Sequence, residues 1–99
     1  MSNSKMTAPN LVTGDVTIRS ERGLNPLLAR QVRDALQAFA CSATIHNRKG
    51  VSADARNLLE LLLLGARKGE PLTVRCVGPD AHAAHEALLV ALTSQGGAT

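Results

Sequence analysis

The sequence predicts one α+β domain, in which a single β-sheet carries all its helices on one face. Short segments that alternate apolar and polar residues are typical of strands with one buried face. Longer segments with apolar residues at helical spacing are typical of helices with one buried stripe. The chain has 99 residues, 44% of them hydrophobic, which suffices for one small domain with a single core. One sheet with helices on one side buries all of these faces together.

The first half of the chain predicts a strand, a helix and a hairpin. Residues 16–20 (VTIRS) alternate apolar and polar, as expected of a half-buried strand. Residues 26–40 place apolar side chains at helical spacing and charged side chains on the opposite side. Residues 42–47 alternate again, and residues 48–50 (RKG) are typical of a hairpin turn that returns into a short strand at 51–53.

The second half predicts a helix, a strand and a final helix. Residues 55–64 (ARNLLELLLL) are strong helix formers, and residues 72–77 (LTVRCV) alternate cleanly. The last helix follows Gly78 and Pro79, with Asp80 as its expected N-cap. The resulting element order is β-α-β-β-α-β-α.

The two ends of the chain differ from the segment between them. Residues 1–10 and 94–99 are small and polar, so we predict flexible tails on both sides of a domain at 11–93. No apolar run follows a basic start, which predicts no signal peptide. The longest apolar run, LLELLLLGA, is too short to cross a bilayer. We therefore expect a cytoplasmic protein that does not enter a membrane.

Charge and aromatic content restrict the class of partner. The formal net charge is +3, and the lysines and arginines are scattered along the chain. Phe39 is the only aromatic residue. Nucleic-acid surfaces usually combine a basic stripe with aromatic side chains that stack on bases. The composition therefore argues against a nucleic-acid partner, and the modest positive charge suits an acidic protein surface better.

Cysteine and histidine positions predict neither a metal site nor a cofactor. Cys41 and Cys76 lie far apart in apolar segments, so we expect small buried side chains rather than a zinc set or a disulfide scaffold. His46 falls on the polar face of a predicted strand. His82 and His85 stand three residues apart on the final helix, where no third ligand is evident, and we expect both to be solvated.

Four local motifs follow one another in the spacing of a known family. They are Gly23-Leu24-Asn25-Pro26-Leu27-Leu28, Ala55-Arg56-Asn57, Leu64-Gly65-Ala66-Arg67-Lys68-Gly69 and Gly78-Pro79-Asp80-Ala81. Together with the element order, they resemble the HPr family of phosphocarrier proteins of the bacterial phosphotransferase system. The resemblance spans about residues 14–93, and the Gly78-Pro79 step and the leucine-rich second helix are similar to the nitrogen-branch variants. It implies an HPr-like open-faced β-sandwich, with a four-stranded, mainly antiparallel sheet and three helices on one face.

The resemblance also implies that three phosphate-handling positions have changed. The family's phosphorylated histidine falls on Asn25, its phosphate-binding arginine on Leu27 and its regulatory serine on Asn57. An imidazole attacks phosphorus through an available lone pair, whereas the lone pair of an amide nitrogen is delocalised into the carbonyl. Leucine offers no donor to phosphate oxygens. We therefore expect no catalytic residue and no enzyme activity, and interpret Asn25 with Pro26 as a strong helix start.

The leucine-rich segment carries more apolar side chains than one buried stripe needs. In the HPr family, outward apolar residues of the second helix dock partner proteins together with the start of the first helix. The resemblance places this docking patch on Leu58, Leu59 and Leu62, with Leu27 beside it. Its partner would be Enzyme I or a regulated target. The alternative is a second helix whose leucines all lie within the core of the monomer.

Three functions therefore remain open at the level of sequence. The favoured one is an HPr-like, non-phosphorylatable protein-binding or regulatory module of the phosphotransferase system. The second is an active phosphocarrier that passes phosphoryl groups from Enzyme I to downstream proteins through an unrecognised residue. The third is a structural or nucleic-acid-binding domain that shares only the simple β-α topology.

Overall fold

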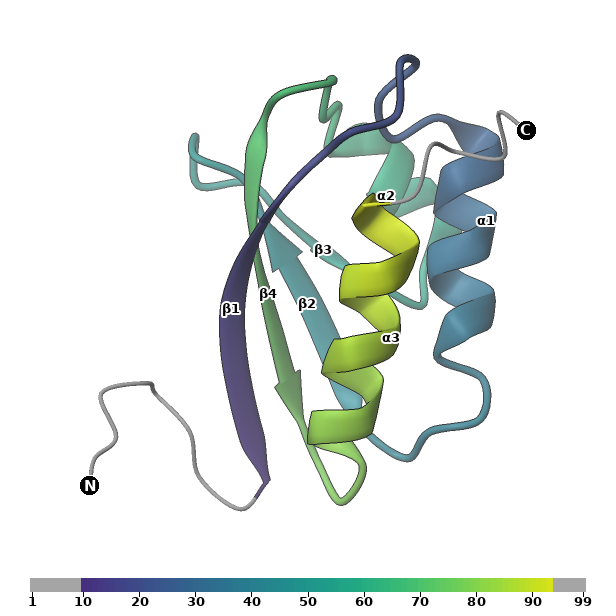
Figure 1. Cartoon of the computed structure of the whole chain (residues 1–99), viewed down its shortest axis with the longest axis vertical. Coiled ribbons are helices and arrows are strands. Elements are labelled where there is room, and N and C mark those ends of the chain that lie inside the picture. The colour runs from purple at the N-terminus through teal and green to yellow at the C-terminus, as the bar shows by residue number, and fades with distance from the viewer. Residues whose placement is uncertain (1–9, 94–99) are drawn as a thin grey trace.

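The computed structural model describes residues 10–93, which form one sheet and three helices in the predicted order (Figure 1). The elements are β1 (Leu11–Thr17), α1 (Pro26–Ala35), β2 (Ser42–His46), β3 (Ser52–Asp54), α2 (Leu58–Leu63), β4 (Pro71–Val77) and α3 (Ala81–Thr93). Of the tails predicted at 1–10 and 94–99, residues 1–9 and 94–99 lie outside the described residues. Asn10, which the sequence assigns to a tail, accepts a hydrogen bond from the Gly78 N–H at 2.8 Å.

The four strands form an antiparallel sheet in the order β1-β4-β2-β3. β4 lies between β1 and β2, and pairs with β1 along its whole length, from Leu11 opposite Val77 to Thr17 opposite Pro71. All three helices lie on one side of this sheet (Figure 1). The predicted α+β class, with an antiparallel sheet and helices on one face, is therefore confirmed.

The first strand is longer and earlier than predicted. It occupies Leu11–Thr17 rather than 16–20, because the seven residues of β4 each find a partner on it. Ile18 is buried but lies beyond the ladder, where its N–H donates to the Glu70 carbonyl at 3.1 Å. The length of an edge strand is set by the neighbour that it pairs with, which its own alternation does not reveal.

Aliphatic side chains fill the core between the sheet and the helices. Its largest fully buried members are Ile18, Leu28, Val32, Leu36, Ile45, Leu61, Leu72, Val74, Cys76, Leu88 and Leu92. Phe39 is only partly buried at its margin. Because branched aliphatic residues pack densely without an aromatic centre, this composition is sufficient for a close-packed interior.

The first helix ends earlier than predicted, at Ala35 instead of residue 40. The guanidinium of Arg56 donates to the carbonyl oxygens of Leu36 at 3.1 Å, Phe39 at 2.8 Å and Cys41 at 2.8 Å. These carbonyls would otherwise lack partners at the end of a helix. A residue distant in sequence thus satisfies the turn that follows α1.

Asp80 does not cap the last helix with its side chain. Its carboxylate accepts from the Ala40 N–H at 2.7 Å, while its own N–H donates to the Ala40 carbonyl at 3.2 Å. The predicted N-cap is therefore wrong as regards the carboxylate, which instead joins the start of α3 to the turn after α1. Only the backbone carbonyl of Asp80 accepts from within α3, from the Ala84 N–H.

Candidate functional site: the α1 start and the surface of α2

Asn25 caps the first helix, as its sequence context predicts. Its backbone is extended, with φ −85° and ψ 178°, and its side-chain oxygen accepts from the Leu28 N–H at 2.9 Å. Pro26 follows as the first helical residue, where its fixed φ suits the helix and its missing N–H costs nothing. The residue pair therefore fixes the point at which α1 begins.

The same geometry limits the chemistry available at this helix start. The Asn25 side-chain oxygen is engaged by Leu28, and the Asn25 backbone carbonyl accepts from the Ala29 N–H at 2.8 Å. The amide nitrogen of asparagine is not a nucleophile, because its lone pair is delocalised. Asn25 is thus placed to stabilise a helix, and it carries no group that attacks phosphorus.

Asn57 performs the same task for the second helix. Its side-chain oxygen accepts from the Glu60 N–H at 3.1 Å. Glu60 in turn accepts from the Asp54 N–H at 2.8 Å, which joins the first turn of α2 to the end of β3. Both positions that the resemblance assigns to phosphorylated residues therefore hold asparagine caps.

The predicted docking leucines differ in exposure. Leu27 is 47% exposed and Leu59 is 65% exposed, whereas Leu58 and Leu62 are half-buried against the core. Leu63, which the prediction omits, is 71% exposed. We call the five residues Leu27, Leu58, Leu59, Leu62 and Leu63 the leucine surface.

Leu63 is hard to single out from the sequence, because residues 58–64 are all leucine except Glu60. The useful signal is the spacing of Leu59 and Leu63, which stand four apart on one face of a helix. That face can be recognised as the outer one only when the buried face is known. The structure supplies this information, because Leu61 and Leu64 are buried.

The start of α1 lies beside the end of α2. The Leu24 N–H donates to the Ala66 carbonyl at 2.9 Å. Gly23 makes this approach possible, because its φ is +68° and a Cβ there would run into the Ala66 carbonyl oxygen. Leu27 in the first turn of α1 and Leu63 in the last turn of α2 therefore belong to neighbouring helix ends.

Three exposed arginines accompany the leucine surface. Arg22 precedes α1, Arg30 lies within it, and Arg67 follows α2. Within residues 10–93, the only salt bridges join Arg33 to Asp34 and Lys68 to Glu21, so these three cations have no acidic partner there. Glu60, exposed on α2 between Leu59 and Leu63, adds one negative charge beside these cations.

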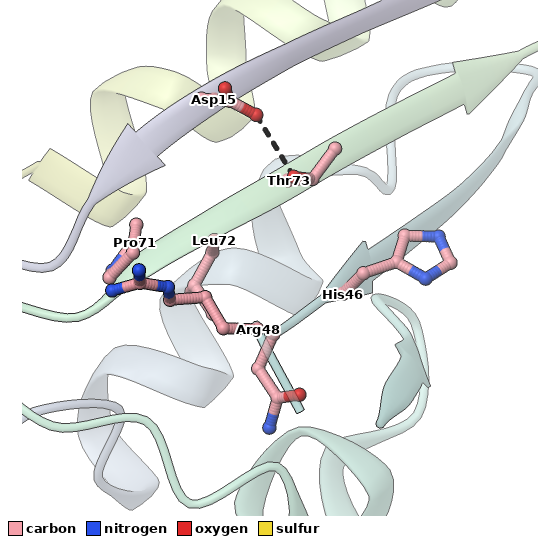
Figure 2. Close-up of a pocket in the computed structure, with 7 residues that line it drawn as sticks. Asp15, His46, Arg48, Pro71, Leu72 and Thr73 are labelled. Atoms are coloured by element: carbon pink, nitrogen blue, oxygen red, sulfur yellow. Dashed lines mark hydrogen bonds between the residues drawn. The ribbon is translucent and has the colours of Figure 1, made fainter. Parts of the chain in front are cut away.

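His46 lies on the face of the sheet that the helices leave open. There it lines a pocket of about 380 Å³ together with Asp15, Asn47, Arg48, Pro71, Leu72 and Thr73 (Figure 2). Asp15 accepts a hydrogen bond from the Thr73 hydroxyl at 2.9 Å across β1 and β4. The structure thus separates His46 from Asn25, which lies on the helical side of the sheet.

The two histidines of α3 differ sharply in environment. His82 is exposed, as expected, but His85 is buried, with 7% of its surface accessible. The prediction of a solvated His85 is therefore wrong. The face of α3 that carries it is turned towards β1, where its ring lies against Gly14.

Both cysteines are free thiols packed on the apolar interior. Cys76 is buried and Cys41 is partly buried against the core. Burial, with a smaller contribution from Cys41, raises the pKa of the Cys76 thiol to about 11, so the thiolate is scarce at neutral pH. The described residues contain no group of three metal-ligating side chains.

None of the helices described between residues 10 and 93 has the length and apolar character needed to cross a bilayer.

Known proteins resemble this chain in sequence. It is 27% identical over 79 residues to the phosphocarrier protein NPr of Escherichia coli (strain K12), covering 80% of this chain and 88% of the relative. It is 39% identical over 80 residues to the phosphocarrier protein HPr of Vibrio cholerae serotype O1, covering 81% of this chain and 92% of that protein.

Solved structures share the fold. A phosphocarrier protein HPr from Bacillus anthracis superposes with a TM-score of 0.78 at 23% identity, over 84% of this chain and 98% of that one. An HPr protein from Thermoanaerobacter tengcongensis gives a TM-score of 0.79 at 18% identity, over 88% and 97% of the two chains. The family model described as the PTS HPr component phosphorylation site matches residues 12–94. The chain therefore belongs to the HPr family of the phosphotransferase system.

Proposed function

We propose that this member of the HPr family is a protein-binding module that does not carry a phosphoryl group. The observation that carries the proposal is the Asn25 cap, whose side-chain oxygen accepts from the Leu28 N–H at 2.9 Å. The family resemblance assigns this position to the phosphorylated histidine. A residue that cannot attack phosphorus and already serves as a helix cap supports loss of the carrier reaction.

Two further positions support the same conclusion. Leu27 supplies no hydrogen-bond donor where the resemblance assigns an arginine that holds the phosphate. Asn57 has no hydroxyl where the resemblance assigns the regulatory serine, and its side chain caps α2 instead. The proposed module is therefore neither an enzyme nor a substrate for the kinase that modifies this serine in the family.

The leucine surface is the proposed docking site. Leu27, Leu59 and Leu63 expose large apolar side chains at neighbouring helix ends. The exposed Arg22, Arg30 and Arg67 lie within or next to the same two helices in the chain. An apolar surface with a basic rim complements a partner that offers an apolar hollow with acidic residues around it. We propose Enzyme I or a regulated target of the phosphotransferase system as this partner, in the cytoplasm.

A phosphorylation assay tests the carrier reaction directly. The full chain is incubated with Enzyme I and phosphoenolpyruvate near neutral pH, and its intact mass is measured without acid treatment. We expect no mass gain, whereas Asn25→His should accept phosphate slowly and Asn25→His with Leu27→Arg should retain it better. A phosphate on the unmodified chain, mapped to His46, His82 or His85, would establish an active phosphocarrier and overturn the proposal.

A binding assay tests the docking surface separately. Leu59→Ser combined with Leu63→Ser should weaken binding to Enzyme I at least tenfold by calorimetry, about 1.4 kcal/mol, since apolar anchors dominate such interfaces. Val90→Ser is the matched control, because Val90 is 68% exposed on α3 and lies outside the leucine surface. Equal binding by the double variant and the parent chain would contradict the proposed docking site, whatever the phosphorylation assay shows.

A further inference from the structure

We propose that His85 makes the packing of α3 against β1 sensitive to protons, so that a neutral imidazole holds the two elements together and a protonated one releases them. This contact lies apart from the leucine surface and does not depend on the proposed function. It rests on the burial of His85, on its unpartnered nitrogen and on its fit against Gly14.

The His85 ring is enclosed without a full set of hydrogen bonds. Only 7% of the residue is accessible, and Nε2 is buried with no hydrogen-bond partner among residues 10–93. A buried polar atom without a partner costs free energy, and a charge at the same place costs far more. The folded protein therefore favours the neutral ring.

Gly14 and His85 fit each other sterically. A Cβ at position 14 would lie 2.9 Å from Cε1 of His85 and 3.0 Å from Nε2, closer than such atoms normally approach. The backbone of Gly14 does not have positive φ, so the requirement for glycine here is one of space. Gly14 pairs with Val74, and the ring thus rests over the junction of β1 and β4.

The charged groups around His85 do not neutralise a protonated ring in its buried place. On α3, Glu86 favours the charged form and His82 disfavours it. On β1, the carboxylate of Asp15 is held by the Thr73 hydroxyl, and on β4 the exposed Arg75 alternates with the buried Val74 and Cys76. Burial is the largest effect, and it lowers the pKa of His85 below its ordinary 6.5 despite Glu86 and the Val74 backbone.

A route for release is present beside the ring. A cavity of about 420 Å³ lies between α3 and β1, lined by Val12, Thr13, Gly14, His82, His85, Glu86 and Leu89. A protonated imidazole that turns into this cavity would gain water and approach Glu86. Such a movement withdraws the ring from Gly14 and thereby loosens the contact between the helix and the edge strand.

The direction of the pH effect follows from linkage. The unfolded chain binds a proton at His85 near the ordinary pKa of 6.5, and the folded chain binds it only at lower pH. At pH values above the pKa of His85 in the unfolded chain, this site therefore contributes its full stability. This contribution declines as the pH falls between the two pKa values. Below the pKa of His85 in the folded chain, the site causes no further loss of stability.

A titration of the full chain tests whether the folded protein favours the neutral form of His85. NMR of the imidazole protons should give His85 a titration midpoint below the ordinary 6.5. After correction for the intrinsic exchange rate at each pH, the amide protons of α3 and β1 should become less protected as His85 becomes protonated. A His85 midpoint at or above 6.5 would overturn the proposal.

Urea unfolding of variants tests whether protonation of His85 destabilises the protein. Between about pH 7.5 and pH 5.5, the unfolding midpoint should fall less in His85→Leu and His85→Gln than in the parent chain, while the His82→Gln control should behave as the parent does. An unchanged fall in both His85 variants would place the pH dependence elsewhere and overturn the proposal.

A pair of substitutions tests the steric fit. Gly14→Ala alone should lower the urea midpoint, because its methyl group meets the ring. The same change in a His85→Ala background should be much less harmful, since the methyl group then enters vacated space. Equal losses in both backgrounds would show that the ring does not occupy the space beside Gly14.

Discussion

α2 and α3 reverse the usual relation between polarity and burial. α2 (Leu58–Leu63) leaves Leu59 and Leu63 largely exposed, whereas α3 (Ala81–Thr93) buries His85. Both helices contribute to the same core, through Leu61 in one and Leu88 in the other. The difference shows that the position of a helix over the sheet, rather than its hydropathy, decides which of its side chains are covered.

The two positions over the sheet explain this reversal. α3 packs against β1, β4 and α1, and five of its residues are buried: Ala81, Ala84, His85, Leu88 and Leu92. α2 packs against α1 and the three-residue strand β3 at the edge of the sheet (Figure 1). A short helix at an edge buries only one stripe, so Leu59 and Leu63 on its outer side face solvent although they are apolar.

Leu61→Ala should have the largest effect of the changes in α2. Leu61 is fully buried, so its truncation leaves a cavity and should cost about 2–5 kcal/mol of unfolding free energy in a urea titration. Leu63→Ala is the matched control, because the same change at an exposed site should stay within about 0.5 kcal/mol. Similar losses at both positions would show that α2 is covered on all sides.

Arg56→Met should have the next largest effect and lower the free energy of unfolding by about 2 kcal/mol, because hydrogen bonds from a charged donor to partly buried carbonyls are strong. The guanidinium joins the residue before the α2 cap to carbonyls of Leu36, Phe39 and Cys41, and methionine keeps only the length of the stem. Arg56→Lys should recover part of the loss. If Arg56→Met melts as the parent chain does, α2 does not depend on this connection to the turn after α1.

Asn25→Ala should lower the free energy of unfolding by about 1 kcal/mol, which is typical of the loss of an N-cap. The change removes the acceptor of the Leu28 N–H. Asn25→Gly should lose only a few tenths of a kcal/mol, because glycine is itself tolerated at this position. A thermal melt with no difference between Asn25→Ala and the parent would contradict a capping role at the α1 start.

Leu63→Ser and Val90→Ser should have the smallest effects on folding, within about 0.5 kcal/mol, since both side chains are mostly exposed. They nevertheless separate the two helices by function. Binding to Enzyme I should weaken in Leu63→Ser and remain unchanged in Val90→Ser. Loss of binding in both variants would extend the docking site from α2 to α3.

Local features of this protein could be predicted from the sequence because their causes are local. The Asn25-Pro26 helix start depends on a side chain and an amide three residues apart. The element order follows from apolar periodicity, and the aliphatic core follows from the near absence of aromatic residues. The α+β class then follows, since a single sheet with helices on one face buries all these surfaces.

Contacts between distant segments were decided by the tertiary structure alone. The extent of β1 depends on β4, the carboxylate of Asp80 bonds to Ala40, and the exposed face of α2 depends on what covers its other side. His85 is buried because α3 turns it towards Gly14, a residue 71 positions earlier that has no side chain. Burial measures the neighbours that folding brings together, and local sequence spacing does not contain that information.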